Sequence, residues 1–218
     1  MKFNRFDVVN GTCIEEIYGQ SRYGYAKSDT TDFYEMEELM ENGGYRGMTI
    51  SFYDYETGKV YEPFGPKRNV LYGDPVFLDE RFWFLQGDYN CRKITLFEYL
   101  PGEEPVEITQ LNVEDVNAYN LGITGEDVYI TSGDEDFTCY YPEHFGFALG
   151  SEESVMLIDD SKVYLSKWVE DGWDDENDCA TEDYKYYEKI VVRDLEGNLI
   201  SEEIGSLDQR PDGSWWIS

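Results

Sequence analysis

The chain has few basic residues, a single histidine and no long apolar run, and each shortage excludes a class of protein. Its 218 residues include 17 lysines and arginines against 47 aspartates and glutamates, which gives a net charge of −30. Such a surface repels nucleic-acid phosphates and anionic lipids, so we expect neither nucleic acid nor membrane as a partner. No stretch approaches the ~18 apolar residues of a membrane-spanning helix, which predicts a cytoplasmic protein.

Cysteine pairs and catalytic motifs are also scarce. The four cysteines, Cys13, Cys91, Cys139 and Cys179, lie far apart without metal-ligand spacing, which predicts free thiols. The nucleophile elbow, the zinc-protease motif, the phosphate loop and the dinucleotide turn are all missing. His144 stands alone in a turn-like segment, and acidic residues are so numerous that no pair stands out as a glycosidase site. The sequence therefore leans against an enzyme.

What the sequence does contain is a copy of itself 140 positions further on. Residues 21–27 align without a gap with 161–167, and the same offset places 49–54 on 189–194. Short segments rich in aromatic and β-branched residues also recur after turn residues, at 82–85, 128–131, 163–166 and 215–218. Their second residues follow one another at spacings of 46, 35 and 52 residues. These spacings bracket the ~40–50 residues of known repeats built from four strands.

Each recurring segment is accompanied by further short strands and by turns that contain glycine, such as 56–59, 100–103 and 195–198. Two short apolar strands followed by two alternating strands indicate a four-stranded antiparallel blade. The chain resembles a β-propeller in its period and strand pattern, although no motif names a particular propeller family. This resemblance covers nearly the whole chain and implies one all-β domain over residues 1–218.

The recurring segments, together with a first one near residues 22–26, predict five blades. The last blade begins at 213–218 and would be completed by residues 2–9. Both termini would then close one blade, so that no sheet edge of the ring stays open. The alternatives are a fragment of a longer propeller and an unrelated β-sandwich.

Two insertions between the second and third strands of their blades are candidate binding segments, because insertions in repeat proteins gather on one face. In the first, residues 28–46, the segment 32–42 is predicted to form a short helix with a polar cap at its start and glycine at its end. The second insertion, residues 169–184, has no lysine or arginine. It carries eight acidic residues: Glu170, Asp171, Asp174, Asp175, Glu176, Asp178, Glu182 and Asp183.

Three interpretations of the acidic insertion are open. The simplest is a solvated, partly disordered loop, because like charges repel one another. The second is a calcium site formed by Asp174, Asp175 and Asp178, whose carboxylates are suitable ligands even though the residue order of an EF-hand loop is absent. Calcium is the only cofactor that the sequence suggests.

The third interpretation is a docking surface for a basic protein partner. It would use Glu170, Asp171, Trp173 and Asp174, with the tryptophan as the anchor. The favoured function is therefore a protein-binding scaffold without catalysis, with an inhibitor or immunity-type protein whose carboxylates mimic phosphates as a special case. The alternative is a propeller enzyme or carbohydrate-binding module with a site in the central channel, with a calcium-dependent site as one form of it. The sequence does not predict the oligomeric state.

Overall fold

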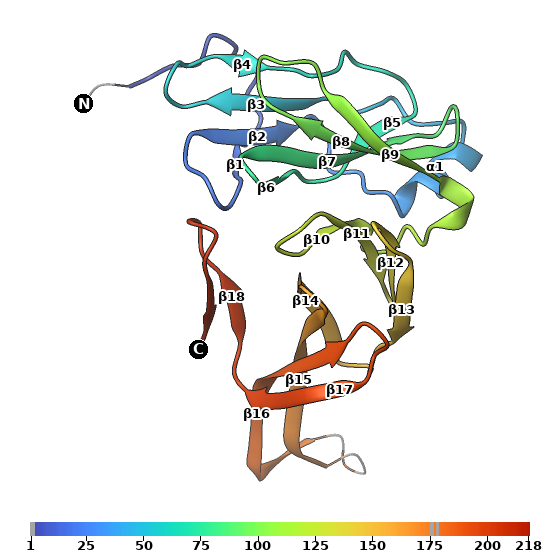
Figure 1. The fold of residues 1–218 in the computed structure, drawn as a ribbon, viewed down its shortest axis with the longest axis vertical. Helices are drawn as coiled ribbons and strands as arrows, with labels where there is room; N and C mark the ends of the chain where they lie inside the picture. Colours follow the sequence, from blue (N-terminus) through green and yellow to red (C-terminus); the bar gives the residue numbers. More distant parts are fainter. Residues whose placement is uncertain (1–2, 175–176, 178) are drawn as a thin grey trace. The chain divides into compact units, whose positions relative to one another are not determined.

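The computed structural model describes residues 3–174, 177 and 179–218, and it is built mainly of antiparallel β-sheet (Figure 1). The chain divides into two compact units. The first runs to Ile123 and includes Arg210–Ser214, and the second comprises Thr124–Gln209 and Trp215–Ser218. None of the described helices is long and apolar enough to cross a membrane. The all-β class and the repeated four-stranded antiparallel sheets are confirmed, while the single domain stays a prediction.

The first sheet of the first unit has four strands in chain order. They are β1 (Glu15–Glu16), β2 (Tyr23–Lys27), β3 (Ile50–Asp54) and β4 (Val60–Tyr61). Asp54 is buried at the end of β3, where it accepts hydrogen bonds from the Arg22 guanidinium at 2.8 Å and from the Glu56 N–H at 2.9 Å. The bond from Arg22 holds the pKa of Asp54 well below its usual range. This buried carboxylate therefore fixes the turn that leads into β4.

The second sheet of the first unit has five strands. They are β5 (Val70–Tyr72), β6 (Val76–Leu78), β7 (Arg81–Asp88), β8 (Lys93–Tyr99) and β9 (Val106–Asn112), followed by the 3-10 helix η1 (Val113–Asp115). Both β5 and β6 pair with β7, and β5 was not predicted from the sequence. The ring of Phe52 in β3 lies 5.2 Å from that of Phe82 and 5.1 Å from that of Tyr99. Many of the aromatic residues of this unit thus form its core.

The second unit contains two four-stranded sheets and one two-stranded sheet. The first consists of β10 (Gly122–Thr124), at which the chain passes into this unit, β11 (Tyr129–Gly133), β12 (Asp136–Tyr141) and β13 (Phe145–Ala148). The second consists of β14 (Glu153–Asp159), β15 (Lys162–Asp174), β16 (Cys179–Asp194) and β17 (Leu199–Ile204). The third pairs β18 (Leu207–Gln209) with β19 (Trp215–Ile217). Phe137, Ile158, Val163, Leu165 and Val191 form the core of this unit.

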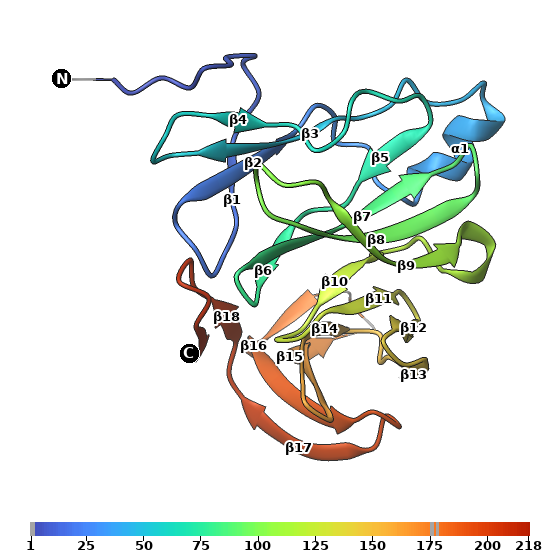
Figure 2. The ribbon, with the colours of Figure 1, turned by 45° about the horizontal axis from the view of Figure 1, so that its top comes forward.

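The predicted helix is present as α1 (Glu35–Glu41), which Figure 2 shows beside β5. The Asp32 side chain accepts the Glu35 N–H at 2.9 Å, and the Glu35 carboxylate accepts the Asp32 N–H at 3.2 Å. This reciprocal pair satisfies two backbone donors at the start of the helix, as in a capping box. After the helix, the Gly44 N–H donates to the Leu39 carbonyl at 2.8 Å, with the glycine at a φ of +93°. The helix therefore lies within the predicted segment 32–42, with the predicted polar cap and terminal glycine, but it is shorter than predicted.

The predicted closing strand at the N-terminus is wrong over the described part of residues 2–9. That part forms no strand, and β19 pairs with β18 alone in the described sheet. Instead, the Asp7 N–H donates to the Gly58 carbonyl at 2.8 Å and the Val60 N–H donates to the Asp7 carboxylate at 3.0 Å. The side chain of Asp7 thus caps a turn of the first sheet. These hydrogen bonds take the place of the strand pairing that was predicted for this segment.

The internal repeat is visible in the strand pairing of the two units, with one difference. The register between the first and second strands is the same in the β1–β2 pair and in part of the β14–β15 pair. In the next pair Tyr25 lies opposite Phe52, whereas Leu165, 140 positions later, lies opposite Val191, one residue short of the equivalent position. Phe52 and Val191 and their strand neighbours are buried, so this shift moves no polar side chain into the core.

Candidate functional site

The acidic insertion is a β-hairpin. Strand β15 extends to Asp174 and β16 begins at Cys179, so the two strands project beyond the rest of their sheet (Figure 1). We call residues 168–188 the hairpin arm. The interpretation of this insertion as a solvated loop is wrong for the described residues, because the backbone groups of β15 and β16 form hydrogen bonds with one another along the arm. Most of its charged side chains are nevertheless exposed to water.

One side of the hairpin arm carries a row of four aromatic rings. We call this row the aromatic ladder: Trp168, Tyr186, Tyr184 and Trp173. The rings of Trp168 and Tyr186 stack with centroids 4.9 Å apart and an interplanar angle of 22°. Tyr184 continues the row, 6.5 Å from Tyr186 and 5.8 Å from Trp173. Trp168, Trp173 and Tyr186 are exposed by 38%, 42% and 62%, so the ladder is a surface feature and not part of the core.

Carboxylates border the ladder, and the one lysine of the arm lies on its other face. Glu170 lies opposite Tyr186 and accepts the Tyr184 hydroxyl at 2.8 Å, a hydrogen bond that raises the pKa of Tyr184. The next pair, Asp171 and Lys185, faces the opposite way because successive strand residues alternate. The ladder face therefore combines flat aromatic surface with negative charge.

The four residues predicted to bind a partner are divided by this geometry. Glu170 and Trp173 come together through Tyr184, which each of them contacts. Asp171 lies on the other face, where it accepts the Tyr187 hydroxyl at 3.2 Å. Asp174 lies at the tip, and its carboxylate accepts the Asn177 N–H at 3.2 Å and the side-chain amide at 2.8 Å.

Sequence reasoning missed Trp168, Tyr184 and Tyr186, which form most of the ladder. The signal was present, since tyrosines at positions 184 and 186 alternate with charged residues in the period of a strand. The acidic run indicates charge more strongly than strand structure, and a solvated loop is one of the three interpretations that it leaves open. In a loop, alternation does not place side chains on a common face.

The calcium interpretation stays a prediction. Two of its three ligands, Asp175 and Asp178, lie outside the described residues. Within the described part of the chain there is no group of three or more histidine, cysteine, aspartate or glutamate side chains that could hold a metal ion. The third ligand, Asp174, is engaged with Asn177 as described above.

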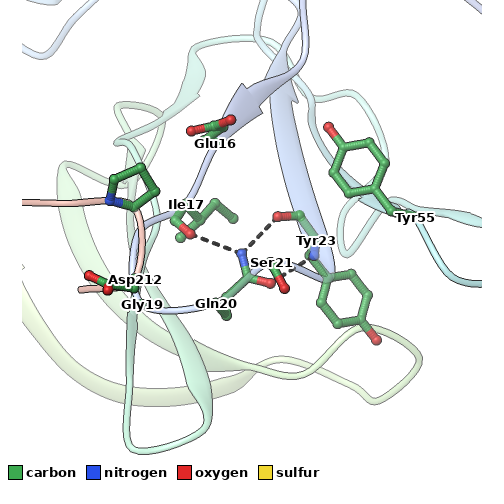
Figure 3. Close-up of a pocket in the computed structure, with 9 residues that line it drawn as sticks. Glu16, Ile17, Gly19, Gln20, Ser21, Tyr23, Tyr55 and Asp212 are labelled. Carbon is green, nitrogen blue, oxygen red and sulfur yellow. Dashed lines mark hydrogen bonds between the residues drawn. The ribbon is translucent and has the colours of Figure 1, made fainter. Parts of the chain in front are cut away.

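The first unit contains a hollow near the turn between β1 and β2 (Figure 3). It measures about 560 Å³, and Glu16, Tyr23, Tyr55 and Asp212 are among its lining residues. The side-chain amide of Gln20 donates to the Ile17 and Tyr23 carbonyls and accepts the Tyr23 N–H, all within 3.0 Å. That amide holds the turn between β1 and β2, so its hydrogen bonds serve the fold. His144 lies elsewhere, with its ring 6.0 Å from that of Tyr140.

Comparison with known proteins gives no family for this chain. No protein-family model matches the sequence, and no curated protein matches it either. The function therefore has to be argued from the surface of the molecule, and the hairpin arm is its most distinctive part.

Proposed function

We propose that this protein is a non-enzymatic scaffold that binds a basic protein partner through the aromatic ladder of its hairpin arm. The observation that carries the proposal is a row of four aromatic rings on a projecting hairpin, bordered by carboxylates. Tryptophan and tyrosine are the residues that most often supply binding energy at interfaces, and each buries 150–250 Å² when covered, by typical values.

The chemistry of the ladder favours arginine in the partner. A guanidinium group is flat, so it stacks on an exposed ring such as Tyr186 while it donates two hydrogen bonds to a carboxylate such as Glu170. Lysine offers only a point charge and stacks less well. The net charge of −30 adds a long-range attraction that speeds the approach of any basic partner.

We further propose that the sheets are blades of a five-bladed β-propeller. Four sheets of four or more antiparallel strands and one of two strands support this count. Closure of the ring by residues 2–9 is not part of the proposal. The hairpin arm then occupies the position between the second and third strands of its blade where insertions commonly carry binding sites.

The test uses arginine peptides as the probe. Nonaarginine and nonalysine should both bind the intact protein, with arginine bound several-fold more tightly at about 0.15 M salt. The double variant Trp168→Ala, Tyr186→Ala should lose at least ~10-fold in affinity for the arginine peptide and lose the preference over lysine. Titration calorimetry measures both quantities.

Trp216→Ala is the matched control, because this tryptophan is exposed by 63% in the same unit but lies outside the arm. It should leave both affinities unchanged. Glu170→Gln should slow association and reduce its salt dependence. If the intact protein and the ladder variant each bound the two peptides with equal affinity, binding would depend on net charge alone. That result would overturn the proposal. Salt-insensitive binding of a neutral oligosaccharide, or tight binding of DNA, would also contradict it.

A further inference from the structure

The outer edge of the sheet that bears the hairpin arm is β17, half of whose residues are large and apolar. β17 pairs with β16, and its other edge pairs with no strand in the described part of the chain. All six of its residues are exposed, and Leu199, Ile200 and Ile204 are exposed by 63%, 51% and 71%. An open edge with apolar side chains is a template for pairing with another strand.

The outer strands of the other described sheets of four or five strands lack this combination. β4 has two residues and β13 has four. β9 is as long as β17, but Val106 is its only strongly exposed large apolar residue. Short edges resist pairing with other chains, whereas β17 has six residues and three strongly exposed large apolar side chains, beside the acids Glu202 and Glu203.

The direction of the backbone groups on β17 follows from one hydrogen bond beyond its end. The Gly205 N–H donates to the Glu188 carbonyl at 3.0 Å, so residue 205 faces β16. The N–H and C=O groups of an antiparallel strand turn to opposite sides at successive residues. The backbone N–H and C=O groups of Glu202 and Ile204 therefore point away from β16, toward the side where a further strand would pair.

The charge at the centre of this edge is compensated within its own sheet. Lys189 of β16 forms an ion pair with the Glu202 carboxylate. This pairing raises the pKa of Lys189 and lowers that of Glu202. The charge of Glu202 is therefore compensated, whereas its exposed neighbour Glu203, on the opposite face of the strand, adds negative charge to the edge.

We propose that β17 pairs antiparallel with β17 of a second copy of this chain, about a two-fold axis that passes through Glu202. In this register Ile204 of each copy lies opposite Ile200 of the other, which occupies the bulge of the β16–β17 pair. The two Glu202 side chains meet with a lysine beside each. The strand is thus self-complementary, as an interface between identical subunits with two-fold symmetry requires. The two sheets become one continuous sheet.

Size and charge determine how strong this dimer is. A single strand edge buries less than the ~1,200–2,000 Å² of a typical stable interface, so the association is weak. A charge of −30 on each copy opposes it, and salt screens that repulsion over a Debye length of ~10 Å at 0.1 M. Salt therefore strengthens self-association, whereas it weakens binding of a basic partner to the arm, so the two proposals are tested independently.

Sedimentation velocity of the full chain tests the dimer. We expect a shift from monomer to dimer as the protein concentration rises from about 10 μM to about 1 mM, at lower concentration when salt rises from ~0.05 to ~0.5 M. In the dimer, the amides of Glu202 and Ile204 should exchange more slowly than in the monomer. The amides of Ser201 and Glu203, which face β16, should not change.

Two variants locate the interface. Ile200→Thr with Ile204→Thr should raise the dimer dissociation constant at least ~10-fold, whereas Val106→Thr at the edge of β9 should leave it unchanged. Ile204→Lys removes an apolar contact and also reduces the net negative charge. It should weaken a dimer formed by β17, because the contact is lost, whereas it should strengthen an association that depends only on net charge. Circular dichroism confirms that each variant is folded. A monomer under all conditions, or a dimer that the substitutions in β17 leave intact or strengthen, would overturn the proposal.

Discussion

Two segments of the same length, 140 positions apart, follow the second strand of a sheet, and they adopt opposite structures: the first connects two strands, whereas the second, here also called a connector, consists mostly of strand residues. Residues 28–49 connect β2 to β3, and residues 168–189 lie 140 positions later. The first folds back on its own unit and buries Phe33 and Met36 at 4% and 0% exposure. The second extends the strands themselves into the hairpin arm and leaves Trp168 exposed by 38%.

The spacing of the apolar residues explains the difference. In the first connector, Phe33, Met36 and Met40 recur every three or four residues, which places Met36 and Met40 on one face of α1 and Phe33 in the turn before it. In the second, Tyr184 and Tyr186 alternate with charged residues, which suits a strand with one aromatic face. A segment whose apolar residues recur every three or four positions can fold back as a helix and bury them, whereas a segment in which they recur every second position continues the sheet into solvent.

Removal of the first connector should have the largest effect. A variant in which Asn-Gly replaces residues 28–49 joins Lys27 to Ile50 in their existing register, with a turn suited to a two-residue hairpin. The first unit should no longer fold, because the loss of several buried side chains at about 2–5 kcal/mol each exceeds a typical stability of 5–15 kcal/mol. Amide hydrogen exchange of β3 and β7 measures this loss.

Removal of the hairpin arm is the matched control for that experiment. Replacing residues 170–186 with Asn-Gly joins Val169 to Tyr187, again in their existing register. The second unit should stay folded, with a change in stability within about 1 kcal/mol, because the deleted side chains lie mostly at the surface. If both deletions had the same effect on their units, the contrast between a folded and a projecting connector would be wrong.

A single substitution sharpens the comparison within the first connector. Phe33→Ala should lower the free energy of unfolding by about 3–5 kcal/mol, because the ring is buried against the first unit. Its neighbour Tyr34 is exposed by 62% and contacts only the edge of Tyr119 among the described rings, at 5.5 Å. Tyr34→Ala should therefore cost less than about 1 kcal/mol. Urea denaturation gives both values, and similar losses would contradict the assignment.

The smallest expected effect is that of Asp29, whose carboxylate accepts hydrogen bonds from other residues of the first connector. Burial alone would raise the pKa of Asp29, but hydrogen bonds from Arg46 and Thr31 outweigh it and lower the pKa to about 2. Since the unfolded value is ~3.9, this carboxylate stabilises the fold above about pH 4, and the stabilisation is lost as the pH falls toward 2. Asp29→Asn should cost about 1 kcal/mol at neutral pH.

Urea denaturation over a pH series tests this prediction. The difference between the variant and the natural protein should shrink as the pH falls from about 5 to about 2. The equivalent position in the second unit is Val169, which has no charge to lose, so Val169→Thr should show a difference that does not vary over this range. A constant difference for Asp29→Asn would mean that its ionisation does not stabilise the connector.

The local elements of this fold could be predicted from the sequence alone. Turn residues between alternating segments located most of the strands, and the acids and glycines around residues 32–44 located α1. These signals are local, because they depend on backbone preference and on neighbours a few residues away. β5 escaped prediction because three apolar residues, Val70–Tyr72, carry no period of their own.

Pairing between distant segments was decided by the tertiary structure. The N-terminal segment reads as a strand, yet the Asp7 carboxylate accepts a hydrogen bond from the Val60 N–H and caps a turn there. The aromatic ladder likewise arises only when the bulged register of the arm brings Trp168 against Tyr186 and Tyr184 against Trp173. The sequence determined where strands and turns form and how charge is distributed, whereas which side chains meet depended on the register of strands, which local preferences do not specify.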